Sequence, residues 1–267
     1  MNNWDMVFQA TISNEQTAAL NSAHFGGEII VVERDEQIQE VCRDLAAQRI
    51  IGFDTETRPS FKAGVTNKVA LLQLSTHQRC YLIRLCRTRL HNSILKILSN
   101  PNILKIGADV AGDIRSLHAL RHFNERGFID LQQIASRWGI EEKSLRKLSA
   151  IVLGQRVSKA QRLSNWEAGN LTPQQQMYAA TDAWVCISIY EKLMATEPVV
   201  KGEEESALIV PTTTPKPKVE NKENQKVANN RTKTPTDKSE KSDKPSRPKF
   251  RYKRRYARKK EDKQITI

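Results

Sequence analysis

The stretch Arg49-Ile-Ile-Gly-Phe-Asp-Thr-Glu-Thr57 decides the fold. Its short apolar half, residues 50–53, is rich in β-branched side chains and predicts a buried strand. Side chains two apart along a strand share a face, so Asp54 and Glu56 should point the same way at the end of this strand. Such carboxylates repel each other unless a proton or a cation lies between them. The pair predicts a site for Mg²⁺ or Mn²⁺, which prefer oxygen ligands, with a simple polar exit from the strand as the alternative.

Patterns on both sides of this stretch predict alternating strands and helices. Further strands are expected over residues 28–33, 69–75, 80–83, 103–107 and 128–131. Helices are expected over residues 35–48, 91–99 and 110–123, from the end of the last strand to Trp138, and from Leu145 to a stop at Gly154. A polar turn separates the second and third of these strands, as in a hairpin, whereas the later strands alternate with helices. This order predicts an α/β fold in which a mixed sheet of five to six strands is flanked by helices on both faces.

The last strong pattern is a helix whose start is marked by Thr172 and Pro173, a capping residue followed by the proline that is favoured in the first turn. The pattern continues to Leu193. Tyr178 and Asp182 are four residues apart on this helix, so they share a face. The small residues around Asp182 would let the helix approach a neighbouring element closely.

A metal site needs more carboxylates than one pair on a strand. Two candidates, Asp109 and Asp113, lie near the start of the predicted helix 110–123. The spacing from the preceding strand favours Asp113, and Asp109 is expected to cap the helix. Asp130, which ends a strand, is expected to cap the helix that follows it.

The charge is distributed unevenly along the 267 residues. Residues 1–200 carry 23 lysines and arginines against 20 acidic residues, whereas residues 201–267 carry 20 against 10. Most of the net charge of +13 therefore belongs to the last quarter of the chain.

The cysteines and the N-terminus bear on the compartment. The four cysteines are far apart and lack metal-binding spacing, which indicates core thiols in a reducing compartment and implies no disulfide framework or zinc cluster. The first residues lack the basic start and apolar run of a secretory signal, and no stretch approaches the ~18 apolar residues of a membrane span. We expect a soluble, intracellular, cytoplasmic protein that has no membrane partner.

Gly52-Phe-Asp-Thr-Glu-Thr57, Asp113, Leu163-Ser-Asn-Trp-Glu167 and Tyr178-Ala-Ala-Thr-Asp182 follow one another in a characteristic order. Together they resemble the DEDD superfamily of 3′–5′ exonucleases, in the tyrosine-containing (DEDDy) branch that includes the Werner-syndrome exonuclease domain and ribonuclease D. None of the five histidines lies where the histidine branch carries its base. The resemblance covers about residues 28–195. It implies a ribonuclease H-like fold and the hydrolysis of phosphodiester bonds from the 3′ end of DNA or RNA by two Mg²⁺ or Mn²⁺ ions.

The resemblance also implies a role for each residue of the motif. Asp54 would bridge both ions, Glu56 and Asp182 would complete the site that holds the attacking water, and Asp113 would anchor the second ion. Tyr178 would orient the water through its hydroxyl and need not ionise, because a metal ion lowers the pKa of bound water.

Outside the motif, Lys159 falls where relatives often carry a basic residue, and it is assigned to contact with a phosphate; a solvated surface lysine is the alternative. Residues 201–267 contain few apolar groups and predict a disordered C-terminal tail. Its end is basic, with nine lysines and arginines among residues 247–260, and aromatic residues lie between them. Basic groups contact phosphates and aromatic rings stack on unpaired bases, so this end is predicted to bind nucleic acid, with a solubilising or protein-binding tail as the alternative. The residues assigned to this binding are Arg251, Tyr252, Lys253, Arg254, Arg255 and Tyr256.

The expected organisation is an N-terminal extension (1–27), an exonuclease domain (28–197), a flexible linker (198–246) and a basic aromatic tail (247–267). DNA repair is the expected process. The alternatives are a ribonuclease D-like enzyme that processes RNA 3′ ends, a catalytically silent nucleic-acid-binding module on the same fold, and an RNA-associated adaptor whose tail is the functional part. The sequence leaves open the choice between DNA and RNA, the preference for single strands or recessed ends, the biological pathway and the oligomeric state.

Overall fold

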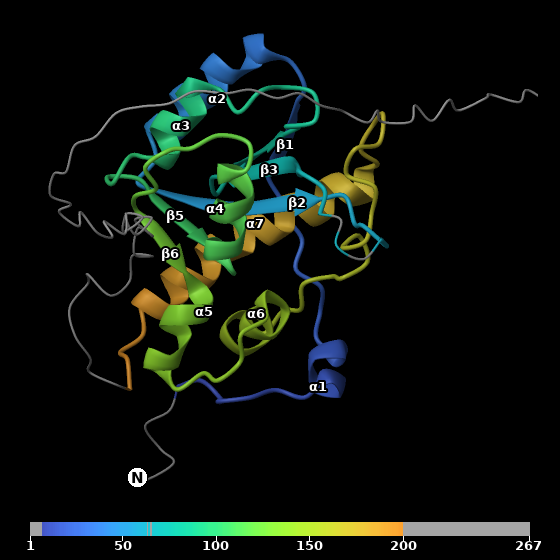
Figure 1. Cartoon of the computed structure of the whole chain (residues 1–267). Coiled ribbons are helices and arrows are strands. Elements are labelled where there is room, and N and C mark those ends of the chain that lie inside the picture. The colour runs from blue at the N-terminus through green and yellow to red at the C-terminus, as the bar shows by residue number, and fades with distance from the viewer. Residues whose placement is uncertain (1–6, 63, 65, 200–267) are drawn as a thin grey trace, which may run out of the picture. The chain divides into compact units, whose positions relative to one another are not determined.

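A six-stranded mixed sheet forms the centre of the fold (Figure 1). This computed structural model describes residues 7–62, 64 and 66–199. The strands lie side by side in the order β1-β4-β3-β2-β5-β6. Their bounds are Glu28–Val32 for β1, Ile50–Thr57 for β2, Val69–Ser75 for β3, Arg79–Ile83 for β4, Leu104–Gly107 for β5 and Phe128–Asp130 for β6. The predicted mixed sheet of five to six strands is confirmed.

The strand that carries the acidic pair, β2, lies in the interior of the sheet. It pairs antiparallel with β3 and parallel with β5. The predicted hairpin is formed by β3 and β4, and the Thr76 hydroxyl closes its turn by accepting hydrogen bonds from the amides of Gln78 and Arg79. The pairing with β3 continues past the apolar half of β2 and includes both Asp54 and Glu56, with a bulge between Glu56 and Thr57. The acids therefore lie on a strand that neighbours support on both sides.

Helices cover both faces of the sheet, as predicted. The helices are α1 (Asn14–Ala19), α2 (Ile38–Ala46), α3 (Asn92–Leu98), α4 (Val110–His118), α5 (Leu131–Ile134), α6 (Leu145–Leu153) and α7 (Pro173–Met194), with short 3₁₀ turns η1 (Asp35–Gln37) and η2 (Ala135–Trp138). One core joins α2, α3 and α4 to β2 side chains such as Phe53, and a second core joins α5, α6 and α7 to side chains such as Ile106. Within the described residues, no helix is both long enough and apolar enough to cross a bilayer.

The long helix α7 lies against β2 at Gly52. A Cβ atom at this residue would stand 1.9 Å from the carbonyl oxygen of Ala183, so a larger residue would push the helix away from the strand. Asp54 follows Gly52 by two residues on the same face of the strand, and Asp182 directly precedes Ala183. The close contact therefore brings an acid of the helix to the acids of the strand.

One predicted helix ends early. The pattern predicted a helix over residues 110–123, but α4 ends at His118. The chain turns there, so that Phe123 packs edge-on against the His118 ring and the buried Glu125 lies 3.4 Å from its Nε2 atom. The apolar residue that extended the helical pattern therefore packs back on the helix from the following loop.

The segment over residues 7–27, for which the sequence predicted only an extension, packs along α6 and α7. The amide of Ala23 donates to the carbonyl of Arg156 over 2.9 Å, and the amide of Phe25 donates to the Thr181 hydroxyl over 3.1 Å. These contacts place His24 beside the N-terminal half of α7.

Asp130, at the end of β6, caps two helices. Its carboxylate accepts a hydrogen bond from the Gln132 amide of α5 over 2.9 Å, as predicted, and others from the amides of Asp109 and Val110 over 3.3 and 3.1 Å. Asp109 occupies the N-cap position of α4, as expected, but its backbone is left-handed (φ 64°) and its side chain makes no capping bond. At this helix start Asp130 accepts from the amides of Asp109 and Val110.

Asp130→Ala is expected to lower the free energy of unfolding by about 2 kcal/mol, because it removes the acceptor from two helix starts and one cap contributes about 1 kcal/mol. Urea unfolding followed by circular dichroism measures the change. Asp130→Asn is the matched control, because it keeps one acceptor oxygen and should lose about half as much. Equal losses in the two variants would contradict the double cap.

Candidate active site

Three carboxylates meet where β2 lies against α7. One carboxylate oxygen each from Asp54, Glu56 and Asp182 can be chosen so that all lie within 4.8 Å of one another. The alternation of the strand puts the first two on one face, and the close contact at Gly52 brings the third to them. The structure thus brings together three of the acids that the sequence singled out.

The three acids lie in a strongly anionic site. Burial raises the pKa of Asp54 to about 7. Burial and the negative charge of Asp54 raise the pKa of Glu56 to about 10. Burial and the same charge hold the pKa of Asp182 well above its usual range. Like charges in a site of low polarity favour protonation, so a bound cation would stabilise the ionised form of all three.

Asp113 approaches this site from α4, on the other face of the sheet. Thr55 lies between the two strand acids and points to that face, where its hydroxyl donates to Asp113 over 2.5 Å. Asp113 is not one of the three acids that lie within 4.8 Å of one another. Burial, and then the charge of Asp54, raise its pKa, so its carboxylate still lies within electrostatic reach of the cluster.

Asp109 also belongs to the electrostatics of the site. Its negative charge contributes to the raised pKa values of both Asp54 and Asp113. Its carboxylate lies over Gly112, where a Cβ atom would stand 2.9 Å from its Oδ2. The backbone of Asp109 is left-handed, which an aspartate tolerates better than most residues, and its side chain makes no capping bond.

Tyr178 lies one turn before Asp182 on α7. Burial, and then the charges of Asp182 and Glu56, hold its pKa well above the usual range. A hydrogen bond to the Asp182 carboxylate acts in the same direction. The Tyr178 hydroxyl therefore keeps its proton at neutral pH. Its ring lies 6.0 Å from that of Trp166, which is fully buried, so Trp166 is a packing residue.

The donor set of this site fits a divalent cation. All of its ligand atoms are carboxylate oxygens, which hard cations prefer. Among the described residues, Oδ1 of Asp182 is a buried acceptor that has no hydrogen-bond partner. Buried polar atoms are nearly always paired, so this oxygen is available to a ligand. Asp54, Glu56 and Asp182 could hold the cation.

Arg162 is a residue that the sequence reasoning missed. Its positive charge acts against the raised pKa of Glu56, which places it within electrostatic reach of the acids. It lies in the same polar stretch as Lys159, three residues after it. The Lys159 side chain is exposed. The abundance of basic residues in that stretch was the available signal, but periodicity could not tell which of them faces the site.

A pocket of ≈ 370 Å³ opens beside the acids. It is lined by Met177, Tyr178 and Asp182 of α7, and by His24 and Gln161 from other segments. The six residues of the basic tail that were assigned to nucleic acid, from Arg251 to Tyr256, lie outside the described residues.

Residues 29–196 match the family described as 3′–5′ exonuclease. The chain belongs to this exonuclease family. Among its relatives, the bifunctional 3′–5′ exonuclease/ATP-dependent helicase WRN of Mus musculus is 34% identical over 163 residues, which are 58% of this chain and 12% of WRN. The exonuclease 3′–5′ domain-containing protein 2 of Drosophila melanogaster is 33% identical over 174 residues, which are 62% of this chain and 30% of that protein. The exonuclease chain thus spans less than a third of the length of either relative.

The fold of this exonuclease family member agrees with solved structures. Escherichia coli ribonuclease D matches with a TM-score of 0.57 and 24% identity, covering 63% of this chain and 44% of that one. The expected ribonuclease H-like α/β fold is confirmed by this match together with the mixed sheet.

Proposed function

We propose that this chain is a metal-dependent 3′–5′ exonuclease that removes nucleotides from the 3′ end of DNA or RNA. The observation that carries the proposal is the meeting of Asp54, Glu56 and Asp182, within 4.8 Å of one another, in a member of the 3′–5′ exonuclease family. Phosphodiesters are anionic, and an uncompensated cluster of carboxylates would repel them. The cluster becomes useful for hydrolysis when cations compensate its charge.

In this proposal Asp54, Glu56 and Asp182 would hold one Mg²⁺ or Mn²⁺ ion, and Asp54 and Asp113 would hold a second. Such ions, when bound, would activate a water and stabilise the leaving oxygen. Thr55 orients Asp113 through its 2.5 Å hydrogen bond, as an outer partner commonly does for a metal ligand.

Tyr178 positions the attacking water in this mechanism. Because its hydroxyl keeps its proton, it acts through hydrogen bonds and does not remove a proton from the water. Tyr178 lines the pocket together with Asp182, to which its hydroxyl bonds, so it would direct a water toward a phosphate bound there.

Substrate contacts are proposed beside the acids. The pocket beside Tyr178 has room for the terminal nucleotide, and Arg162 and Lys159 would contact phosphates near its mouth. The basic aromatic tail would tether single-stranded nucleic acid and raise the local substrate concentration, an effect that should fade as salt increases.

The test is digestion of 5′-labelled single-stranded DNA, recessed-end DNA and RNA of the same sequence, each with Mg²⁺, Mn²⁺ or EDTA. We expect a ladder that shortens from the 3′ end and disappears in EDTA. Relative rates on the three substrates then identify the preferred nucleic acid. A folded protein that binds these substrates and cleaves none would contradict the proposal and favour a silent binding module.

A further inference from the structure

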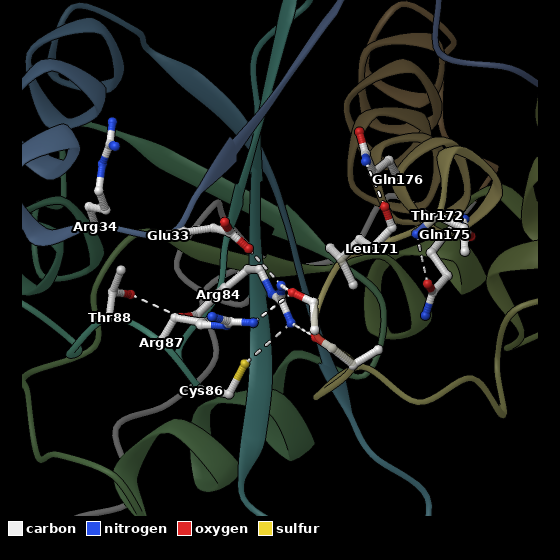
Figure 2. A network of polar contacts seen from close by, with 12 residues as sticks. Glu33, Arg34, Arg84, Cys86, Arg87, Thr88, Leu171, Thr172, Gln175 and Gln176 are labelled. Atoms are coloured by element: carbon white, nitrogen blue, oxygen red, sulfur yellow. Dashed lines mark hydrogen bonds and ion pairs between the residues drawn. The ribbon is translucent and has the colours of Figure 1, made fainter.

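Arg84 is a fully buried arginine that directly follows β4. Its Nη1 atom lies 2.6 Å from the Glu33 carboxylate and donates to the carbonyl of Gly169 over 2.9 Å, while Nη2 donates to the carbonyl of Ala168 (Figure 2). Charged side chains are almost never fully buried unless they are paired. Here the guanidinium joins the end of β1 to two successive carbonyls of the loop that leads into α7.

A second arginine reaches the same loop. Arg87 donates through Nη2 to the carbonyl of Gly169 over 2.6 Å (Figure 2). The Gly169 carbonyl thus accepts bonds from two guanidinium groups. Unlike Arg84, Arg87 is exposed, so its bond competes with water and contributes less to the position of the loop.

The anchored carbonyls lie between two parts of the proposed substrate site. Upstream in the same loop are Gln161, which lines the pocket, and Arg162, whose charge reaches Glu56. Downstream, Thr172 caps α7, the helix of Tyr178. A displacement of residues 168–169 would therefore shift Gln161 and Arg162, which lie upstream in the same loop.

A purely stabilising role does not account for this arginine. Nε of Arg84 is buried and has no hydrogen-bond partner among the described residues. Burying a guanidinium requires desolvation, and well-packed apolar residues often stabilise a fold as well as a buried ion pair does. The planar fork of an arginine, however, can fix two carbonyls and a carboxylate in one geometry, which neither a lysine nor an apolar residue can do.

We propose that Arg84 is a positioning residue that sets the place of the loop carrying Gln161 and Arg162, and thereby the binding of the nucleic-acid 3′ end. It acts through the carbonyls of Ala168 and Gly169 and touches neither the acids nor the substrate. The inference rests on the proposed exonuclease function, because it assigns Arg162 to the substrate of that reaction.

The test is steady-state cleavage of a 3′-hydroxyl oligonucleotide by Arg84→Met, Arg84→Lys and Arg162→Gln and by the double variant Arg84→Met/Arg162→Gln. We expect Arg84→Met to raise KM on the order of tenfold and to change kcat by less than about threefold, since the lost contact would bind the substrate and the transition state equally. Arg84→Lys keeps the charge without the fork and should fall between wild type and Arg84→Met. In the double variant the effects on KM should not add, because both changes act on one contact.

Two further measurements separate positioning from general destabilisation. Arg84→Met should be cleaved faster by trypsin after Arg162, while Mn²⁺ binding to the acids, measured by titration calorimetry, stays unchanged. Arg89→Met is the matched control, because Arg89 pairs with Asp35 at the surface over 3.1 Å, and it should change neither KM nor tryptic cleavage.

The outcomes distinguish this inference from the proposed function. An active wild type together with an unchanged KM in Arg84→Met, or additive effects in the double variant, would overturn the positioning role and leave the exonuclease proposal intact. A wild type that cleaves no substrate would overturn the exonuclease proposal first. The inference would then fall with it, even if tryptic cleavage confirmed that Arg84 anchors the loop.

Discussion

Asp54→Asn is expected to lower the rate of 3′-end hydrolysis at least about a thousandfold while the protein stays folded. Asp54 interacts electrostatically with each of the other acids, because its charge contributes to the raised pKa values of Glu56, Asp113 and Asp182. In the proposed mechanism it holds both cations, and metal ions supply several kcal/mol of transition-state stabilisation. A loss of about 4 kcal/mol corresponds to roughly a thousandfold in rate.

Single-turnover digestion of a 5′-labelled oligonucleotide in Mg²⁺ measures this loss, and circular dichroism checks the fold. Asp35→Asn is the matched control, since it makes the same chemical change at a carboxylate that pairs with Arg89 at the surface, and it should keep the wild-type rate. A variant at Asp54 that retains a tenth of the activity would remove this residue from the catalytic centre.

The second large effect is a pH-dependent stabilisation by metal. Asp54 and Glu56 have pKa values of about 7 and about 10 in the folded protein, against ordinary values of 3.8 and 4.5. Between these limits the metal-free folded protein binds more protons than the unfolded chain does. Its stability therefore falls as pH rises from about 4 toward 10. A cation can compensate the acids once they have lost their protons. Metal should therefore stabilise the protein most at high pH, where the acids of the folded protein are ionised.

Thermal unfolding at pH 5.5, 7.0 and 8.5 with EDTA or with millimolar Mn²⁺ tests this prediction. The melting temperature in EDTA should fall with pH, and the rise caused by Mn²⁺ should grow to several degrees at pH 8.5. Asp54→Asn should show a weaker dependence in both conditions. The same Mn²⁺ effect at all three pH values would mean that the ion does not replace protons at these acids.

The sequence predicted the parts of the site that depend on local geometry. Strand alternation is enough to place Asp54 and Glu56 on one face, and helical periodicity places Tyr178 one turn before Asp182. The cap by Asp130 at α5 follows from neighbouring residues in the same way. In each case a fixed local repeat decides the direction of the side chain.

The remaining features depend on contacts between distant segments. Asp109 occupies the N-cap position of α4 without a side-chain capping bond, and the amides at this helix start donate to Asp130, at the end of β6. No repeat in the sequence indicates that Arg84 reaches Ala168 across the fold, or that Arg162 faces the acids. Such contacts depend on how the loops pack against the sheet. The hydrophobic pattern of the sequence does not determine this packing.

The contact between Gly52 and the carbonyl of Ala183 has a consequence for how such a protein can diversify. The spacing between strand and helix is set by main-chain atoms, so replacement of side chains in the surrounding loops leaves it unchanged. Loop residues beside the acids, such as Ser158, Ala160 and Gln161, can therefore be replaced without moving the acids. Natural selection can retune which nucleic acid is accepted while the arrangement of the acids is inherited intact.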